Sequence, residues 1–216
     1  MSLDSLEQFI QEGDLQGLKQ LLDKNPELAK SITSYRVSAV MLACYYKKPA
    51  VTEVLLKYID ELSLFEAAAI GKFDVVAHLV YMHPDLVNEF SDDGFTPLGL
   101  ACYFSQPEIA RFLVLKGADV NLASRNGFHV APIHSAVAAN QTEITRMLIE
   151  HGAMVNVKQQ SGVTPLHSAA QNGNLEILIL LLENGAQVNV RMEGGKLPAD
   201  LAEEKGFMEI AAILTD

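Results

Sequence analysis

Histidine and cysteine are the side chains that most often bind metals or act as nucleophiles, and the chain holds six histidines and two cysteines. His134 and His167 lie 33 residues apart in similar local sequences, Pro-Ile-His and Pro-Leu-His. The other histidines show no metal-ligand spacing; they are His78, His83, His129 and His151. The two cysteines, Cys44 and Cys102, each precede a tyrosine and are too few for a disulfide framework. The pattern predicts no metal site and no cofactor.

Other motifs that could carry chemistry are incomplete. The segment Gly194-Gly195-Lys196-Leu197 lacks the upstream glycine and the following serine or threonine of a phosphate-binding loop. No serine lies in a Gly-x-Ser-x-Gly elbow. Asn140-Gln141-Thr142 matches a glycosylation signal by chance, and the adjacent acids Asp92 and Asp93 suit a solvated loop tip. We therefore expect a protein that is not an enzyme.

Composition and charge narrow the possible partners. Of the 216 residues, 49% are hydrophobic and 20% are charged, which is typical of a globular protein with a large core. The net charge of -11 disfavours binding to nucleic acid and to anionic membranes, but leaves a basic or neutral protein partner open. The start, Met1 to Glu7, carries acids where a signal peptide needs bases, and apolar runs such as Ile177 to Leu182 are too short to span a bilayer. These features predict a cytoplasmic protein.

A sequence pattern recurs along the chain and must supply the elements that position these residues. The clearest copy begins Thr164-Pro165-Leu166-His167-Ser168-Ala169-Ala170, passes Gly173, and closes with Gly185-Ala186-Gln187-Val188-Asn189. Copies ending at Asn121 and Asn156 share the Gly-Ala-x-Val-Asn closure, and weaker copies begin near Asp4, Ser38, Leu62 and Leu197. The pattern resembles the ankyrin repeat. The resemblance implies an all-α solenoid of stacked helix-turn-helix pairs with short hairpin-like fingers, which typically binds proteins.

The resemblance covers nearly the whole chain as one domain, 1–216. Its repeats are expected at about 1–34, 35–60, 61–91, 92–124, 125–159, 160–192 and 193–216, with the first and last acting as polar caps.

From Lys47 to Gly71 the spacing is only 24 residues, against a repeat of about 33. The missing segment is the finger between repeats two and three. Two interpretations remain open: a tolerated loop deletion, or a gap that opens the groove beside repeat two. This short spacing and the segment Leu64 to Ala69 resemble bacterial ankyrin-repeat proteins.

The clearest repeat also shows why it should fold. Thr164 is expected to cap the first helix, with Pro165 at its first position. Alanines on one face let neighbouring helices approach closely, and Gly185 is expected to end the second helix in the left-handed conformation. The resemblance implies that the repeat histidine forms local hydrogen bonds. Because stacked helices lie about 10 Å apart, His134 and His167 cannot share a metal, and Cys44 and Cys102 are expected in the core, too far apart for a disulfide.

Binding residues are expected on the exposed face of the first helices. Two successive repeat positions there carry four aromatic residues, Tyr45, Tyr46, Tyr103 and Phe104, while the third repeat has Ala69 and Ile70. At 100° per residue, Tyr46 and Phe104 are expected to point farther from the core than Tyr45 and Tyr103. Aromatic side chains dominate binding hot spots, so we expect this row to contact the partner.

The fingers are expected to add a rim around this row. Its side chains are Arg36, Phe95, Arg125, Phe128 and Gln160. The sequence thus predicts a monomeric adaptor, scaffold or inhibitor that holds a protein in its concave groove. Two alternatives are a small-molecule or peptide-processing site in the groove, and a role as substrate of an asparagine-modifying enzyme.

Overall fold

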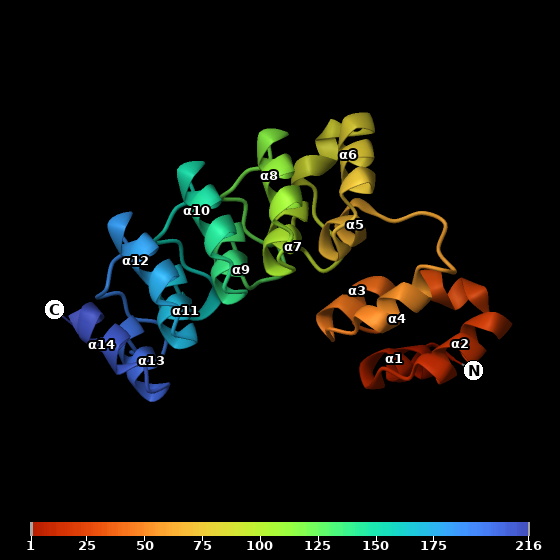
Figure 1. Ribbon diagram of the computed structural model, residues 1–216, viewed down its shortest axis with the longest axis horizontal. Coiled ribbons are helices and arrows are strands. Elements are labelled where there is room, and N and C mark those ends of the chain that lie inside the picture. The colour runs from red at the N-terminus through yellow and green to blue at the C-terminus, as the bar shows by residue number, and fades with distance from the viewer. Residues whose placement is uncertain (1, 216) are drawn as a thin grey trace.

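The computed structural model describes residues 2–215, which form fourteen α-helices in seven consecutive antiparallel pairs (Figure 1). No strand occurs in that range; the one extended pairing is an isolated bridge between Ile32 and Ser38. The first helices of the pairs are α1 (Leu3–Glu12), α3 (Ala39–Tyr45), α5 (Leu64–Ile70), α7 (Pro97–Tyr103), α9 (Pro132–Ala138), α11 (Pro165–Asn172) and α13 (Pro198–Glu204). The second helices are α2 (Leu15–Lys24), α4 (Pro49–Leu55), α6 (Phe73–Met82), α8 (Pro107–Leu115), α10 (Thr142–Glu150), α12 (Leu175–Glu183) and α14 (Met208–Thr215). Short 3-10 turns are η1 (Pro26–Lys30), η2 (Pro84–Asn88) and η3 (Gln160–Gly162).

The N-terminus of α11 is capped by a different side chain from the one expected from the sequence. The Thr164 hydroxyl receives no backbone hydrogen bond from α11 and instead lies 2.8 Å from Nδ1 of His167. That ring nitrogen also accepts the Thr164 N–H at 3.2 Å. His134 accepts the N–H of Ala131 in the same way at 3.2 Å, although Ala131 has no hydroxyl. The imidazole at the third position of each helix therefore accepts the N–H group of the residue that precedes the helix.

Small side chains let the first helices pack closely. Ala67, Ala101, Ala136 and Ala169 are each fully buried between neighbouring first helices. The second helices bury their leucines and isoleucines against the same core, for example Leu113 on α8. The expected solenoid of stacked pairs is thereby confirmed.

The stack is interrupted between the second and third pairs. Buried apolar residues form two clusters, one built from α1 to α4 with Ala69 and Leu100, and the other from α5 to α14. Helix α3 packs on α5, whereas α4 does not pack on α6 as α6 does on α8. In Figure 1 the first four helices run across the direction of the others. The interruption coincides with the short connection between Leu55 and Leu64.

A finger is present at each of the remaining junctions between helix pairs, and no finger is present at this one. Each finger is a tight turn closed by a backbone hydrogen bond, as in Thr33 N–H to Val37 O at 2.8 Å. The five fingers are residues 33–37, 91–95, 124–130, 159–163 and 192–196. No such turn closes in the connection from 56 to 63. The expected loss of one finger is thus confirmed.

The cysteines occupy two environments. Cys102 is fully buried, and burial raises the pKa of its thiol. Cys44 is only partly buried, because it lines a cleft at the interruption, and burial raises the pKa of this thiol to about 11. Both thiols are free. Cys102 therefore lies in the core as expected, whereas Cys44 packs against the core but is only partly buried.

We expect Gly173→Ala to destabilise the fold more than Gly117→Ala. Both glycines have positive φ, +71° and +93°, where an L side chain costs about 1–2 kcal/mol. A Cβ at Gly173 would also lie 2.5 Å from the Phe207 ring, whereas one at Gly117 would meet nothing within 4 Å. Urea unfolding should show an additional loss of about 1 kcal/mol for Gly173→Ala. Equal losses would show that Phe207 moves away freely.

Candidate functional site

Three aromatic rings from non-adjacent pairs meet on the first-helix side of the stack. Tyr45 at the end of α3 lies 6.4 Å from Tyr103 and 5.4 Å from Phe104, measured between ring centroids. Tyr103 and Phe104 are themselves 5.0 Å apart in an edge-to-face arrangement. The intervening helix α5 has the small, buried Ala69 at the equivalent position, which lets rings two pairs apart touch. We call these three residues the aromatic cluster.

A hydrogen bond fixes the centre of the aromatic cluster. The Tyr45 hydroxyl donates to Oδ2 of Asp93 at 2.5 Å, and the Ser91 hydroxyl donates to Oδ1 of the same carboxylate at 2.5 Å. Burial, followed by this hydrogen bond, raises the pKa of Tyr45. Tyr45 thereby joins α3 to the finger 91–95 across the interruption.

The exposed fractions of the aromatic side chains show that the orientation expected for Tyr103 and Phe104 is reversed. Tyr46 is 40% exposed and faces solvent as expected, and Tyr45 is partly buried. In the second pair, however, Tyr103 is 42% exposed and Phe104 is the partly buried ring. Phe104 lies beyond the end of α7 and turns back onto Tyr45, so its direction does not follow the helical repeat. Tyr103 is therefore the outward ring of this pair.

Tyr35 belongs beside these residues, although the sequence did not single it out. It is 53% exposed on the finger 33–37, and its hydroxyl accepts a hydrogen bond from Gln11 at 3.1 Å. A hydrogen bond with Tyr35 raises the pKa of Tyr46. The two tyrosines form an exposed pair at the N-terminal end of the row. The only sequence signal was an aromatic residue next to a turn.

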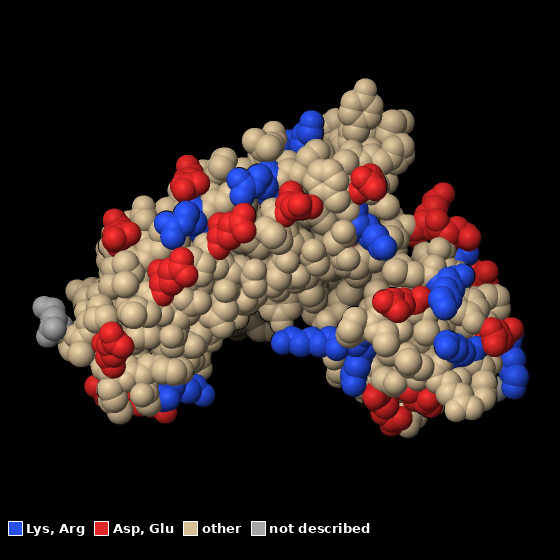
Figure 2. Space-filling view, in the orientation of Figure 1, with Lys and Arg blue, Asp and Glu red and all other residues tan. Residues whose placement is uncertain are grey.

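An apolar pocket of about 290 Å³ adjoins the aromatic cluster. Its lining comes from the first helices α3, α7, α9 and α11, and from the fingers; it includes Tyr45, Phe95, Tyr103, Val130, Ala138 and Ser168. The small side chain of Ala138 leaves space here. Figure 2 shows uncharged atoms along much of the hollow beneath the arch in this view, with a basic side chain projecting into it from the N-terminal part of the molecule.

The remaining expected residues are distributed along the fingers and the interruption. Arg125 is exposed, but its guanidinium lies 4.0 Å from the Phe90 ring centroid. Phe128 is 57% exposed, and its carbonyl accepts the Gln160 N–H at 2.8 Å.

Ile70 and Phe104 line a cleft of about 410 Å³ between α4 and α5, which Lys47, Lys48 and Lys72 also line. Arg36 lines a separate cleft of about 640 Å³ on the finger side. The structure therefore brings Phe95 to the aromatic cluster, but not Arg36, Arg125, Phe128 or Gln160.

A family model described as ankyrin repeats, in three copies, matches residues 6–124 and 122–192. The chain belongs to the ankyrin-repeat family. Similar curated proteins include alpha-latrocrustotoxin-Lt1a from Latrodectus tredecimguttatus, which is 34% identical over 48% of this chain and 8% of its own length. Protein phosphatase 1 regulatory subunit 27 from Mus musculus is 37% identical over 30% of this chain and 42% of its own. DNA-binding protein RFXANK from Homo sapiens is 36% identical over 31% of this chain and 26% of its own. The matched part thus spans less than half the length of each of these relatives.

The two repeat histidines of this ankyrin-repeat protein, His134 and His167, have structural roles, as the resemblance implied. Their Nδ1 atoms accept N–H groups at the helix starts. The Nε2–H of His134 points to the carbonyl of Val157 at 3.1 Å, between α10 and the finger 159–163, and that of His167 points to the carbonyl of Lys196 at 3.4 Å, in the next repeat. Burial lowers the pKa of His134 to about 4 and also lowers the pKa of His167. Both rings are therefore neutral at pH 7, and His167 ties its ankyrin repeat to the next.

Within residues 2–215, no three His, Cys, Asp or Glu side chains lie close enough to hold a metal ion. No helix in this range has the length and apolar character needed to cross a bilayer. The outstanding local feature of this ankyrin-repeat protein is the aromatic cluster and its adjoining pocket.

Proposed function

We propose that this ankyrin-repeat protein is a non-catalytic binding module that holds a protein partner along its groove, as an adaptor, scaffold or inhibitor. The observation that supports this proposal is the aromatic cluster of Tyr45, Tyr103 and Phe104, with Tyr103 42% exposed and an apolar pocket beside it. An exposed apolar patch of this kind is typical of a recognition surface. One similar protein is named a phosphatase regulatory subunit, a role in keeping with a binding module.

The cluster suits binding because its centre is already ordered. Tyr45 is held by Asp93 and by two neighbouring rings, so little conformational entropy is lost when a partner covers it. Tyr103 presents a large apolar face together with a hydroxyl group, the combination that makes tyrosine frequent in hot spots. The fingers supply a rim in which Phe128 and Gln160 are exposed. In this proposal the protein acts as a cytoplasmic monomer and requires no cofactor.

Substitution of the exposed tyrosines tests the proposal. We expect Tyr46→Ala/Tyr103→Ala to lower recovery of the specific partner at least about tenfold, because truncating a hot-spot side chain typically costs 1–2 kcal/mol or more. The measurement is affinity capture from lysate of the native host, with quantitative mass spectrometry of the recovered proteins. Neither substitution removes a fully buried side chain, so the fold should be retained.

The matched control is Tyr81→Ala. Tyr81 is 80% exposed on α6, a second helix outside the groove, and its loss removes the same type of side chain. The control should recover the partner as well as the unaltered chain does. If the double variant recovers every protein equally well, the groove is not the binding surface.

A further inference from the structure

Neighbouring fingers are joined by main-chain hydrogen bonds. The N–H of Arg125 donates to the carbonyl of Gly94 at 2.8 Å, and the N–H of Gln160 donates to the carbonyl of Phe128 at 2.8 Å. The N–H of Glu193 donates to the carbonyl of Ser161 at 2.7 Å. In each case the donor is the second residue of its finger, and the acceptor belongs to the preceding finger. Four fingers therefore form a continuous hydrogen-bonded row.

The row stops at the interruption of the stack. The second residue of the finger 91–95 is Asp92, and its N–H donates to no acceptor within residues 2–215. On the other side, the carbonyls of Tyr35 and Arg36 in the finger 33–37 accept no hydrogen bond in that range. The finger that would lie between them is the one that the short 24-residue spacing removes. On both sides of the gap, main-chain groups that form hydrogen bonds in the other fingers thus have no partner among the described residues.

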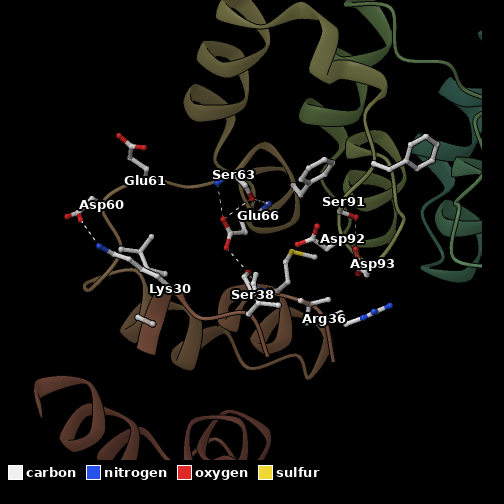
Figure 3. Close-up of a pocket in the computed structure, with 17 residues that line it drawn as sticks. Lys30, Arg36, Ser38, Asp60, Glu61, Ser63, Glu66, Ser91, Asp92 and Asp93 are labelled. Carbon is white, nitrogen blue, oxygen red and sulfur yellow. Dashed lines mark hydrogen bonds and ion pairs between the residues drawn. The ribbon is translucent and has the colours of Figure 1, made fainter. Parts of the chain in front are cut away.

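A cleft of about 640 Å³ lies at this gap, within the range of about 300–1,000 Å³ typical of ligand sites. Arg36, Ser38 and Met41 line one wall, and the segment from Phe90 to Asp93 lines the opposite wall. Figure 3 shows Arg36 on the α3 side, with Ser91, Asp92 and Asp93 across from it. Phe65 of α5 contributes an apolar part of the lining. The cleft thus has two polar walls and an apolar component.

The charges on the lining are unequal. Five carboxylates line the cleft, Asp60, Glu61, Glu66, Asp92 and Asp93, against two basic residues, Lys30 and Arg36. The Lys30 ammonium is already paired with Asp60 at 3.1 Å. Glu66 accepts hydrogen bonds from Ser38 at 2.6 Å and Ser63 at 2.8 Å, and Asp93 accepts those of Tyr45 and Ser91. Asp92 and Glu61 keep carboxylates without a protein donor among the described residues, so the cleft attracts positive charge.

We propose that this cleft binds a basic, finger-shaped peptide segment of a partner protein, which takes the place of the missing finger. A main-chain carbonyl of the segment would accept the Asp92 N–H, and a main-chain N–H would donate to a carbonyl of the finger 33–37. A lysine or arginine of the segment would pair with Asp92. Main-chain pairing at an open edge is a general mode of peptide recognition. The site is distinct from the aromatic cluster and goes beyond the groove binding proposed above.

The chain itself offers a suitable probe. The finger 124–130 already lies between two fingers, donates through the Arg125 N–H and accepts through the Phe128 carbonyl. It also carries an arginine. A fluorescein-labelled synthetic peptide with the sequence of residues 122–132 is expected to bind the full chain, as measured by fluorescence polarisation at about 0.15 M salt. A peptide with glutamate in place of its arginine should bind at least about tenfold more weakly.

Two matched comparisons separate this site from general attraction to an acidic protein. Asp92→Lys should weaken binding of the peptide at least about tenfold, whereas Asp85→Lys makes the same charge change on η2, outside the cleft, and should leave binding unchanged. Methylation of the peptide nitrogen at arginine should weaken binding, while methylation at the glycine that matches Gly127 should not. Thermal unfolding will verify that both variants are folded.

Equal weakening by Asp92→Lys and Asp85→Lys would overturn the proposal, because binding would then depend on net charge alone. Equal binding of the two methylated peptides would overturn the main-chain pairing. Tyr46→Ala/Tyr103→Ala should bind the probe normally, so a failure of the groove proposal would remain distinguishable from a failure of this one.

Discussion

Replacing Leu21 with alanine is expected to unfold the first two helix pairs while the remaining five stay folded. Leu21 is fully buried on α2 in the N-terminal apolar cluster, and truncating a buried leucine typically costs about 2–5 kcal/mol. In a stacked-repeat protein each pair is stabilised only by its neighbours. Because α4 does not pack on α6, little of the second cluster depends on the first. The loss should therefore remain within α1 to α4.

Hydrogen exchange during urea unfolding measures this separation. In Leu21→Ala, amides of α1 to α4 should lose protection at a lower urea concentration than amides of α7 to α14. The matched variant is Leu148→Ala, which truncates a fully buried leucine on α10 in the other cluster. It should give the reverse order. A single transition with the same midpoint for all amides in both variants would show that the interruption does not uncouple the two parts.

The stacked helices were predictable because the repeat puts strong local signals at fixed positions. Proline opens α7, α9, α11 and α13, and the buried alanines and leucines recur on the expected faces. The missing finger was also visible as a short spacing. The divergence of α4 from α6 was not predictable, because it depends on how the connection 56–63 directs the chain rather than on which residues are apolar.

The orientation of the aromatic rings shows where periodicity stops applying. Tyr46 and Phe104 are the residues after their helices, where the helical conformation ends, so a 100° step no longer gives the direction of their rings. Phe104 turns to Tyr45, two repeats away, and Tyr46 approaches Tyr35 on a finger. Such contacts depend on the three-dimensional stacking. The sequence identified the positions that carry rings, but not which rings face outward.

The N-cap of α11 is another feature that local sequence rules do not predict. A threonine before proline is a common helix start, and Thr164 was expected to use its own hydroxyl. His167 instead occupies the position that accepts the Thr164 N–H, and its other nitrogen reaches Lys196 in the next repeat. A rule based on local residues cannot reveal a hydrogen bond to a residue 29 positions away.

Lowering the pH from 7.5 to 5 is expected to destabilise the protein through His134. Burial lowers the pKa of His134 to about 4 in the folded chain, whereas an unfolded histidine titrates near 6.5. Between these values the unfolded chain takes up a proton that the folded chain does not, so stability falls as the pH drops from about 6.5 toward 4. At pH 5 this single histidine should lower the free energy of unfolding by about 2 kcal/mol relative to pH 7.5.

His134→Gln isolates this contribution. At pH 7.5 the variant should be less stable than the unaltered chain, because it loses the paired hydrogen bonds to Ala131 and Val157. Since glutamine does not titrate, the difference in unfolding free energy should shrink by about 2 kcal/mol at pH 5. Urea unfolding at both pH values measures this change, and His78→Gln, which removes an exposed histidine on α6, serves as the control. A difference that stays constant between the two pH values would mean that His134 is protonated in the folded chain at pH 5, and its role as a neutral ring that bridges Ala131 and Val157 would have to be abandoned.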